Sequence, residues 1–114
     1  MRDDNAYLKH ILDSILFVEK YCGKLDVASF LKDELLQSAV VRQLEIIGEA
    51  GKLLSKETKM KLPAIQWNML IGMRNKLIHE YFGVDINVVW STINEELPKL
   101  KAEIKRYLNG SEKA

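Results

Sequence analysis

Apolar residues recur every three or four positions along most of the chain, the spacing that places them on one face of an α-helix. The pattern predicts four main helices, at about residues 4–22, 33–54, 65–81 and 85–107. Short helical turns are expected at 27–32 and from about residue 57. No stretch alternates with a period of two, so the pattern predicts an all-α fold: an antiparallel bundle of four main helices.

Local signals mark where these helices begin and end. Asp3 or Asp4, Asp26 and Asp85 are predicted N-caps, and Gly23 is expected to end the first helix. Pro98 should kink the last helix, because it lacks an amide hydrogen. Two buried stripes are expected, in the first helix Leu8, Ile11, Leu12, Ile15, Leu16 and Val18, and in the last helix Ile86, Val89, Trp90, Ile93, Leu97, Leu100, Ile104 and Tyr107.

The helix at 33–54 contains two glycines and a polar strip. Gly48 and Gly51 cost about 1 kcal/mol each in helix propensity, which indicates that another helix approaches closely at those positions. Arg42, Glu45 and Glu49 follow at spacings of three and four. They are interpreted either as local ion pairs on a solvated edge, or as carboxylates that orient a functional group on a neighbouring helix.

The helix at 65–81 breaks its own pattern at Arg74, which falls within the apolar sector. A buried guanidinium is costly unless a partner or a wet cleft receives it. Asn75 and His79 form a polar ridge beside it. Tyr81, seven residues after Arg74, would point from the helix axis in nearly the same direction as Arg74. The plain alternatives are that Arg74 snorkels or pairs with a nearby carboxylate, that His79 is simply solvated, and that Tyr81 is a core aromatic.

Composition limits the functions that the chain can have. Its 114 residues suit a single domain, 1–114, with a frayed polar tail at 109–114. Seventeen basic residues against sixteen acidic ones exclude a strong overall field for nucleic acid. One cysteine, Cys22, and two histidines, His10 and His79, supply no disulfide and no His/Cys metal cluster. We expect a cytoplasmic protein without a signal peptide, membrane span or cofactor, because no such segment or phosphate-binding loop is seen.

These limits leave one metal-free route to RNA cleavage: attack by the ribose 2′-hydroxyl on the adjacent phosphodiester. This reaction needs a group that exchanges protons near neutral pH and a cation that stabilises the phosphorane. Histidine and arginine are suited to those two tasks.

Residues 74–81 match the Arg-x4-His-x-Tyr motif of the HEPN superfamily, and the chain resembles the HepT-type ribonuclease toxins within it. The likeness extends from about residue 33 to 105 and includes the stretches 41–50 and 81–85, Trp67 and Trp90. The short Arg/His motif is weakly specific, whereas the longer block from Gly72 through Asp85 is strongly specific.

The resemblance implies a helical bundle that dimerises so that its motifs meet in a cleft. It implies a metal-independent endoribonuclease, the toxin of a type VII toxin–antitoxin system, with Arg74 and His79 catalytic. Asn75, Glu45 and Arg42 are expected to support them. It also implies an MntA-like minimal nucleotidyltransferase antitoxin that neutralises the toxin by transferring AMP from ATP to Tyr81. The alternative is a non-catalytic helical subunit that binds a nucleotide or substrate for such a nucleotidyltransferase.

Overall fold

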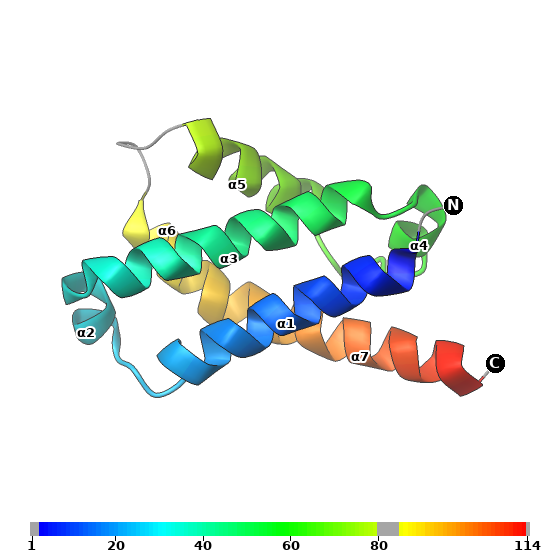
Figure 1. Cartoon of the computed structure of the whole chain (residues 1–114), viewed down its shortest axis with the longest axis horizontal. Helices are drawn as coiled ribbons and strands as arrows, with labels where there is room; N and C mark the ends of the chain where they lie inside the picture. Colours follow the sequence, from blue (N-terminus) through cyan, green and yellow to red (C-terminus); the bar gives the residue numbers. More distant parts are fainter. Residues whose placement is uncertain (1–2, 80–84, 114) are drawn as a thin grey trace.

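A computed structural model describes residues 3–79 and 85–113, and the backbone alone for residues 78, 79 and 111–113. Seven α-helices and one π-helical segment form within these residues, and no strand does. Figure 1 shows the long helices running in alternating directions along the molecule, with the start of α1 and the end of α7 at the same end. The elements are α1 (Asp4–Cys22), α2 (Val27–Lys32), α3 (Glu34–Leu53), α4 (Lys56–Met60), α5 (Trp67–His79), α6 (Ile86–Ser91), η1 (Thr92–Glu96) and α7 (Leu97–Lys113). The predicted all-α bundle is confirmed.

Aspartate side chains begin several helices where the sequence predicted them. Asp3 accepts a hydrogen bond from the amide of Ala6 at the start of α1, over 3.1 Å. Asp26 begins α2, where its carboxylate accepts a hydrogen bond from the amide of Ser29. Hydrogen bonds from the backbone and the side chain of Ser29 hold the pKa of the Asp26 carboxyl below its ordinary value. The turn predicted from about residue 57 is α4, which begins one residue earlier, at Lys56, and is capped by Ser55.

The core is formed mainly by side chains of α1, α3 and α7, in which α1 packs on both α3 and α7, while α5 packs on α3 and α2 packs on α3 and α6. Its largest fully buried side chains come from α1, α2, α3, α6 and α7 and from the connection after α4: Leu8, Ile11, Ile15, Phe30, Val40, Ile47, Leu62, Val89, Leu97, Leu100 and Ile104. Leu16, predicted to be buried, is 46% exposed. The predicted stripe was too wide, because α1 packs mainly against α3 and α7 and leaves the sector that holds Leu16 facing solvent.

The last helix is not continuous α-helix. Residues Thr92–Glu96 adopt π-helical geometry, and the amide of Leu97 donates to the carbonyl of Thr92, five residues earlier. Pro98 follows directly and cannot donate to the carbonyl of Asn94. The expected disruption near Pro98 therefore takes the form of a π-helical segment. Residues 109–113, expected to be a frayed tail, continue α7 as helix, because no proline or cap stops it there.

Cys22, at the end of α1, is buried. Burial raises the pKa of its thiol, and the negative charge of Asp33 raises it further. The thiol is therefore held in its protonated form, which is a poor nucleophile. No helix in the described part of the chain combines the length and apolarity needed to cross a bilayer.

Candidate functional site

Helices α3 and α5 approach each other closely at Gly48 of α3, which lies against Arg74 of α5. A Cβ atom on Gly48 would lie 2.2 Å from the Cβ of Arg74 and 3.0 Å from the carbonyl oxygen of Leu70. One turn further along α3, a Cβ on Gly51 would lie 3.2 Å from the ring of Trp67. The predicted close approach at both glycines is confirmed, and it sets the backbone of Arg74 directly on α3.

The guanidinium of Arg74 is held by two side chains. It forms a close ion pair with Glu49 of α3, and its Nη1 donates to Oδ1 of Asn75 over 2.8 Å. The Arg74 side chain is 20% exposed, against 68% for Arg42. A guanidinium has five N–H donors, so these two contacts leave others for an incoming anion. Arg74 is thus neither locked in a dry interior nor free in solvent.

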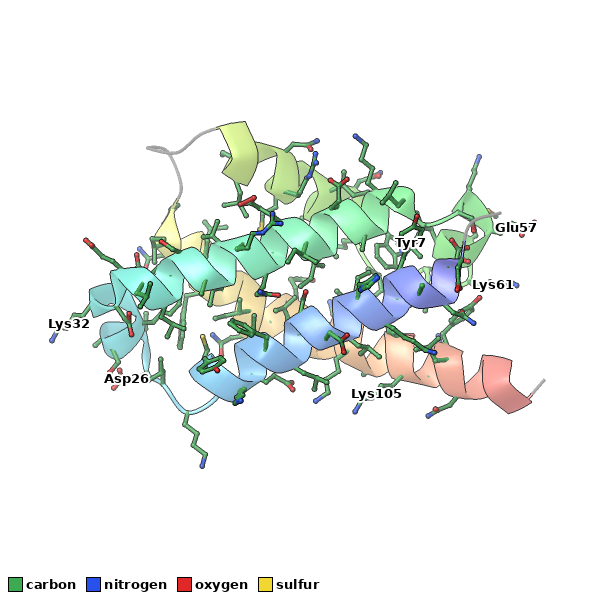
Figure 2. All side chains as sticks on the ribbon, viewed as in Figure 1. Tyr7, Asp26, Lys32, Glu57, Lys61 and Lys105 are labelled. Carbon is green, nitrogen blue, oxygen red and sulfur yellow. The ribbon has the colours of Figure 1, made fainter. Side chains whose placement is uncertain are left out.

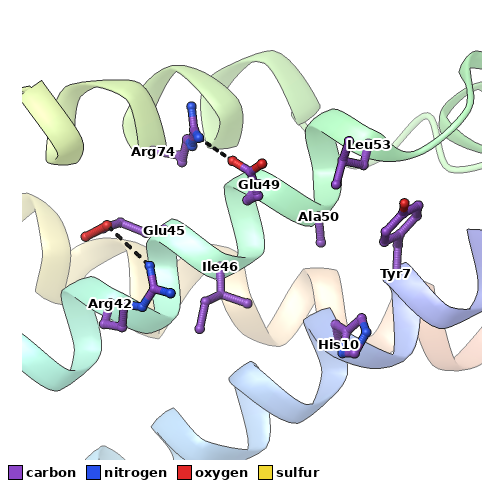
Figure 3. Close-up of a pocket in the computed structure, with 9 residues that line it drawn as sticks. All are labelled: Tyr7, His10, Arg42, Glu45, Ile46, Glu49, Ala50, Leu53 and Arg74. Atoms are coloured by element: carbon purple, nitrogen blue, oxygen red, sulfur yellow. Dashed lines mark hydrogen bonds and ion pairs between the residues drawn. The ribbon is translucent and has the colours of Figure 1, made fainter.

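Arg74 forms one edge of a surface groove that follows the outer face of α3, which we call the α3 groove. Its volume is about 380 Å³. Figure 3 shows Tyr7 and His10 projecting from α1 toward α3, with Arg74 and Glu49 across the helix from them. The lining comprises Tyr7 and His10 from α1, Arg42, Glu45, Ile46, Glu49, Ala50 and Leu53 from α3, and Arg74 from α5.

The helical repeat of α3 explains this lining. Positions 42, 45, 46, 49, 50 and 53 recur every three or four residues and so share one face. Val40, Leu44 and Ile47 point into the core instead. One face of α3 therefore builds the core while the adjoining face forms the floor of the groove between α1 and α5.

The predicted supporting residues are placed in two ways. Asn75 contacts Arg74 directly. Arg42 and Glu45 form a local ion pair of 3.8 Å and line the α3 groove without a described contact to Arg74. Local pairing therefore accounts for these two residues, whereas the carboxylate that orients Arg74 is Glu49.

Two predicted site residues cannot be placed. The backbone of His79 belongs to α5, but its side chain lies outside the described part of the structure, and Tyr81 lies outside the described residues altogether. Tyr7 and His10 were not predicted as site residues. Their only signal in the sequence is a spacing of three on the polar side of α1.

Comparison with known proteins bears directly on this arrangement. Residues 11–107 match the family described as "Ribonuclease HepT-like". The chain belongs to the HepT-like ribonuclease family. The match spans all of α3 and α5 and therefore includes Gly48, Glu49 and Arg74.

Three relatives resemble the chain over nearly their full length. A "Putative RNase" of Caldanaerobacter subterraneus subsp. tengcongensis is 44% identical over 95% of this chain and 96% of its own. A "Probable ribonuclease HepT" of Thermococcus cleftensis is 41% identical over 92% of this chain and 96% of its own. A "Putative RNase" of Methanocaldococcus jannaschii is 38% identical over 91% of this chain and 95% of its own. No solved structure matches significantly. Ribonuclease activity is thus supported at the level of the family.

Proposed function

We propose that the chain is the toxin of a type VII toxin–antitoxin system and acts as a metal-independent endoribonuclease on unpaired RNA. The observation that supports this most strongly is Arg74, whose guanidinium is oriented by Glu49 and Asn75 at the edge of an open groove. A cation fixed in this way can receive a phosphate without first being ordered. Membership in the HepT-like family supports the same activity.

The proposed reaction is intramolecular transfer at phosphorus. The 2′-hydroxyl oxygen attacks the adjacent phosphorus and loses its proton, while the bond from phosphorus to the 5′-oxygen breaks and that oxygen gains a proton. The products are a 2′,3′-cyclic phosphate and a 5′-hydroxyl. His79 exchanges these protons, and Arg74 stabilises the additional negative charge of the phosphorane.

Glu49 has a definite role in this proposal. Its ion pair with Arg74 neutralises the guanidinium in the resting protein and fixes its direction. A phosphate approaching Arg74 binds the donors that Glu49 and Asn75 leave free, beside this carboxylate. Glu49 is therefore a positioning residue, and Glu49→Gln should retain the hydrogen bond while weakening the fixed charge pair.

The first prediction concerns catalysis. His79→Ala and Arg74→Ala should each reduce the cleavage rate of a single-stranded RNA at least a hundredfold, because each removes a group acting in the transition state. The rate is measured with a fluorescently labelled oligonucleotide, in EDTA and in Mg²⁺, and it should be the same in both. Arg106→Ala is the matched control: Arg106 also pairs with a carboxylate, Glu103, but on the exposed surface of α7.

Helical circular dichroism should be unchanged in these variants. Cleavage by His79→Ala at the wild-type rate, with the protein freed of contaminating nuclease, would refute the catalytic assignment. If neither the wild type nor any variant cleaves RNA, the chain is a binding subunit instead.

We further propose that a minimal nucleotidyltransferase antitoxin transfers AMP from ATP to Tyr81 and releases pyrophosphate. The adduct would place a phosphodiester anion near Arg74 in the motif, where it would compete with the RNA phosphate for the guanidinium. The second prediction is that co-expression with the neighbouring nucleotidyltransferase gene adds the mass of one AMP moiety or more and restores cell growth. Tyr81→Phe should block both effects, as intact-mass spectrometry and growth curves would show. Growth restored with the mass unchanged would contradict AMP transfer.

A further inference from the structure

Tyr7 and His10 face the same groove as Arg74 but have no part in the chemistry proposed above. They stand three residues apart on α1, so both point to the side of the helix that meets α3. Figure 2 shows Tyr7 between α1 and α3. We propose that these two residues and the floor of the α3 groove form a subsite for one unpaired nucleotide of the RNA, beside the phosphate that Arg74 receives. This inference rests on the proposed function and extends it to substrate binding.

The floor of the groove suits a base. Ile46, Ala50 and Leu53 present aliphatic surface next to the half-buried ring of Tyr7. Proteins that bind single-stranded RNA place its bases on aromatic side chains and apolar surface in this way. The groove volume of about 380 Å³ lies within the range of small-ligand sites.

The charges of the groove favour a nucleotide over a simple anion. Arg42 and Arg74 are balanced by Glu45 and Glu49, so the groove has no net charge if His10 is neutral. For a bare phosphate, attraction to the two arginines is offset by repulsion from the two carboxylates. A nucleotide can bind both the positive and the negative side chains, because its phosphate accepts hydrogen bonds from an arginine while its ribose hydroxyl or base amino group donates to a carboxylate.

His10 supplies the remaining polar contact. It is exposed at the wall opposite Arg74 and can either donate or accept a hydrogen bond at a base edge. Contacts from α1 on one side and α5 on the other would hold the nucleotide across α3. A base within a duplex cannot enter the groove in this way, which agrees with a preference for unpaired RNA.

The experiment separates binding from cleavage. Binding is measured by fluorescence anisotropy with a single-stranded, mixed-sequence 2′-O-methyl oligonucleotide, which lacks the attacking hydroxyl and so stays intact in the wild-type protein. Tyr7→Leu should weaken binding roughly tenfold, the effect of losing one base-stacking ring. His10→Ala should weaken it roughly threefold, the effect of losing one hydrogen bond. On cleavable RNA, both variants should raise KM and leave kcat unchanged.

Matched controls come from the same helix. Tyr21→Leu removes an exposed tyrosine that packs on Phe17 at the far end of α1, and Lys9→Ala removes the exposed neighbour of His10. Unchanged binding in Tyr7→Leu and His10→Ala, or equal losses in the controls, would overturn the subsite. If these variants lose binding but the wild type does not cleave RNA, the subsite stands and the catalytic proposal fails. If cleavage depends on Arg74 but not on Tyr7 or His10, the catalytic proposal stands and the subsite fails.

Discussion

At the scale of single residues, the site depends on a missing side chain as much as on those present. Gly48 has no Cβ, so Arg74 lies directly on α3 and its guanidinium extends to Glu49, one position along that helix. A larger residue would push α5 outward at this point. The direction of the arginine is therefore coupled to the packing of two helices.

This coupling gives the third prediction. In Gly48→Ala the new Cβ would clash with Arg74, and overpacking of this kind costs about 1–3 kcal/mol, only partly offset by better helix propensity. The free energy of unfolding, measured with urea, should fall by about 1 kcal/mol or more, and cleavage should fall with it. Gly72→Ala is the matched control on α5, where a Cβ would meet nothing within 4 Å. It should raise stability by about 0.5–1 kcal/mol. A Gly48→Ala protein as stable and active as Gly72→Ala would contradict the coupling.

The sequence located Arg74 but not its partner. A cation inside an apolar sector indicated that a carboxylate or a wet cleft receives it, and the structure provides both. Glu45 and Glu49 lie on one strip of α3, so only the register between α3 and α5 decides which one reaches Arg74. Tyr7 and His10 were missed for a similar reason, because they reach the groove only once α1 packs on α3.

At the scale of elements, helix boundaries were predictable because the signals that set them are local. Asp33 caps α3 through the amide of Leu36 and Asp85 caps α6 through the amide of Asn87, both at 2.9 Å. A carboxylate that accepts from a backbone amide two or three residues later can be recognised in any sequence. The predicted bounds of α1, α2 and α3 therefore agree with the structure to within a residue.

Contacts between elements were not predictable in the same way. The carboxylate of Asp4 accepts hydrogen bonds from Ser55, through both its amide and its hydroxyl, and from the hydroxyl of Thr58 over 2.6 Å. These bonds join the start of α1 to α4, about fifty positions away in the sequence. From the sequence, Asp4 is predicted only as a local cap of the first helix. No local pattern encodes such a contact, because it depends on how the whole bundle closes.

At the scale of the molecule, several large apolar side chains face solvent. Leu35 is 83% exposed and Met60 70%, and Leu31 and Val88 are also exposed. The dimer that the family resemblance implies would cover such apolar surface, and it stays a prediction. One chain supplies a single Arg74 to the groove, whereas the proposed reaction moves protons at two oxygens. A dimer that joins two motifs would supply two histidines and two arginines to a shared cleft.

The last prediction tests that sharing. Arg74→Ala and His79→Ala proteins are each expected to be inactive, but a heterodimer of the two retains one intact arginine and one intact histidine in the cleft. Mixing them under conditions that allow subunit exchange should therefore restore cleavage, measured on labelled single-stranded RNA. Exchange is verified with two affinity tags, and each variant mixed with itself is the control. If the heterodimers form and remain as inactive as their parents, one arginine and one histidine from different chains do not make a working site, and this form of the shared cleft is wrong.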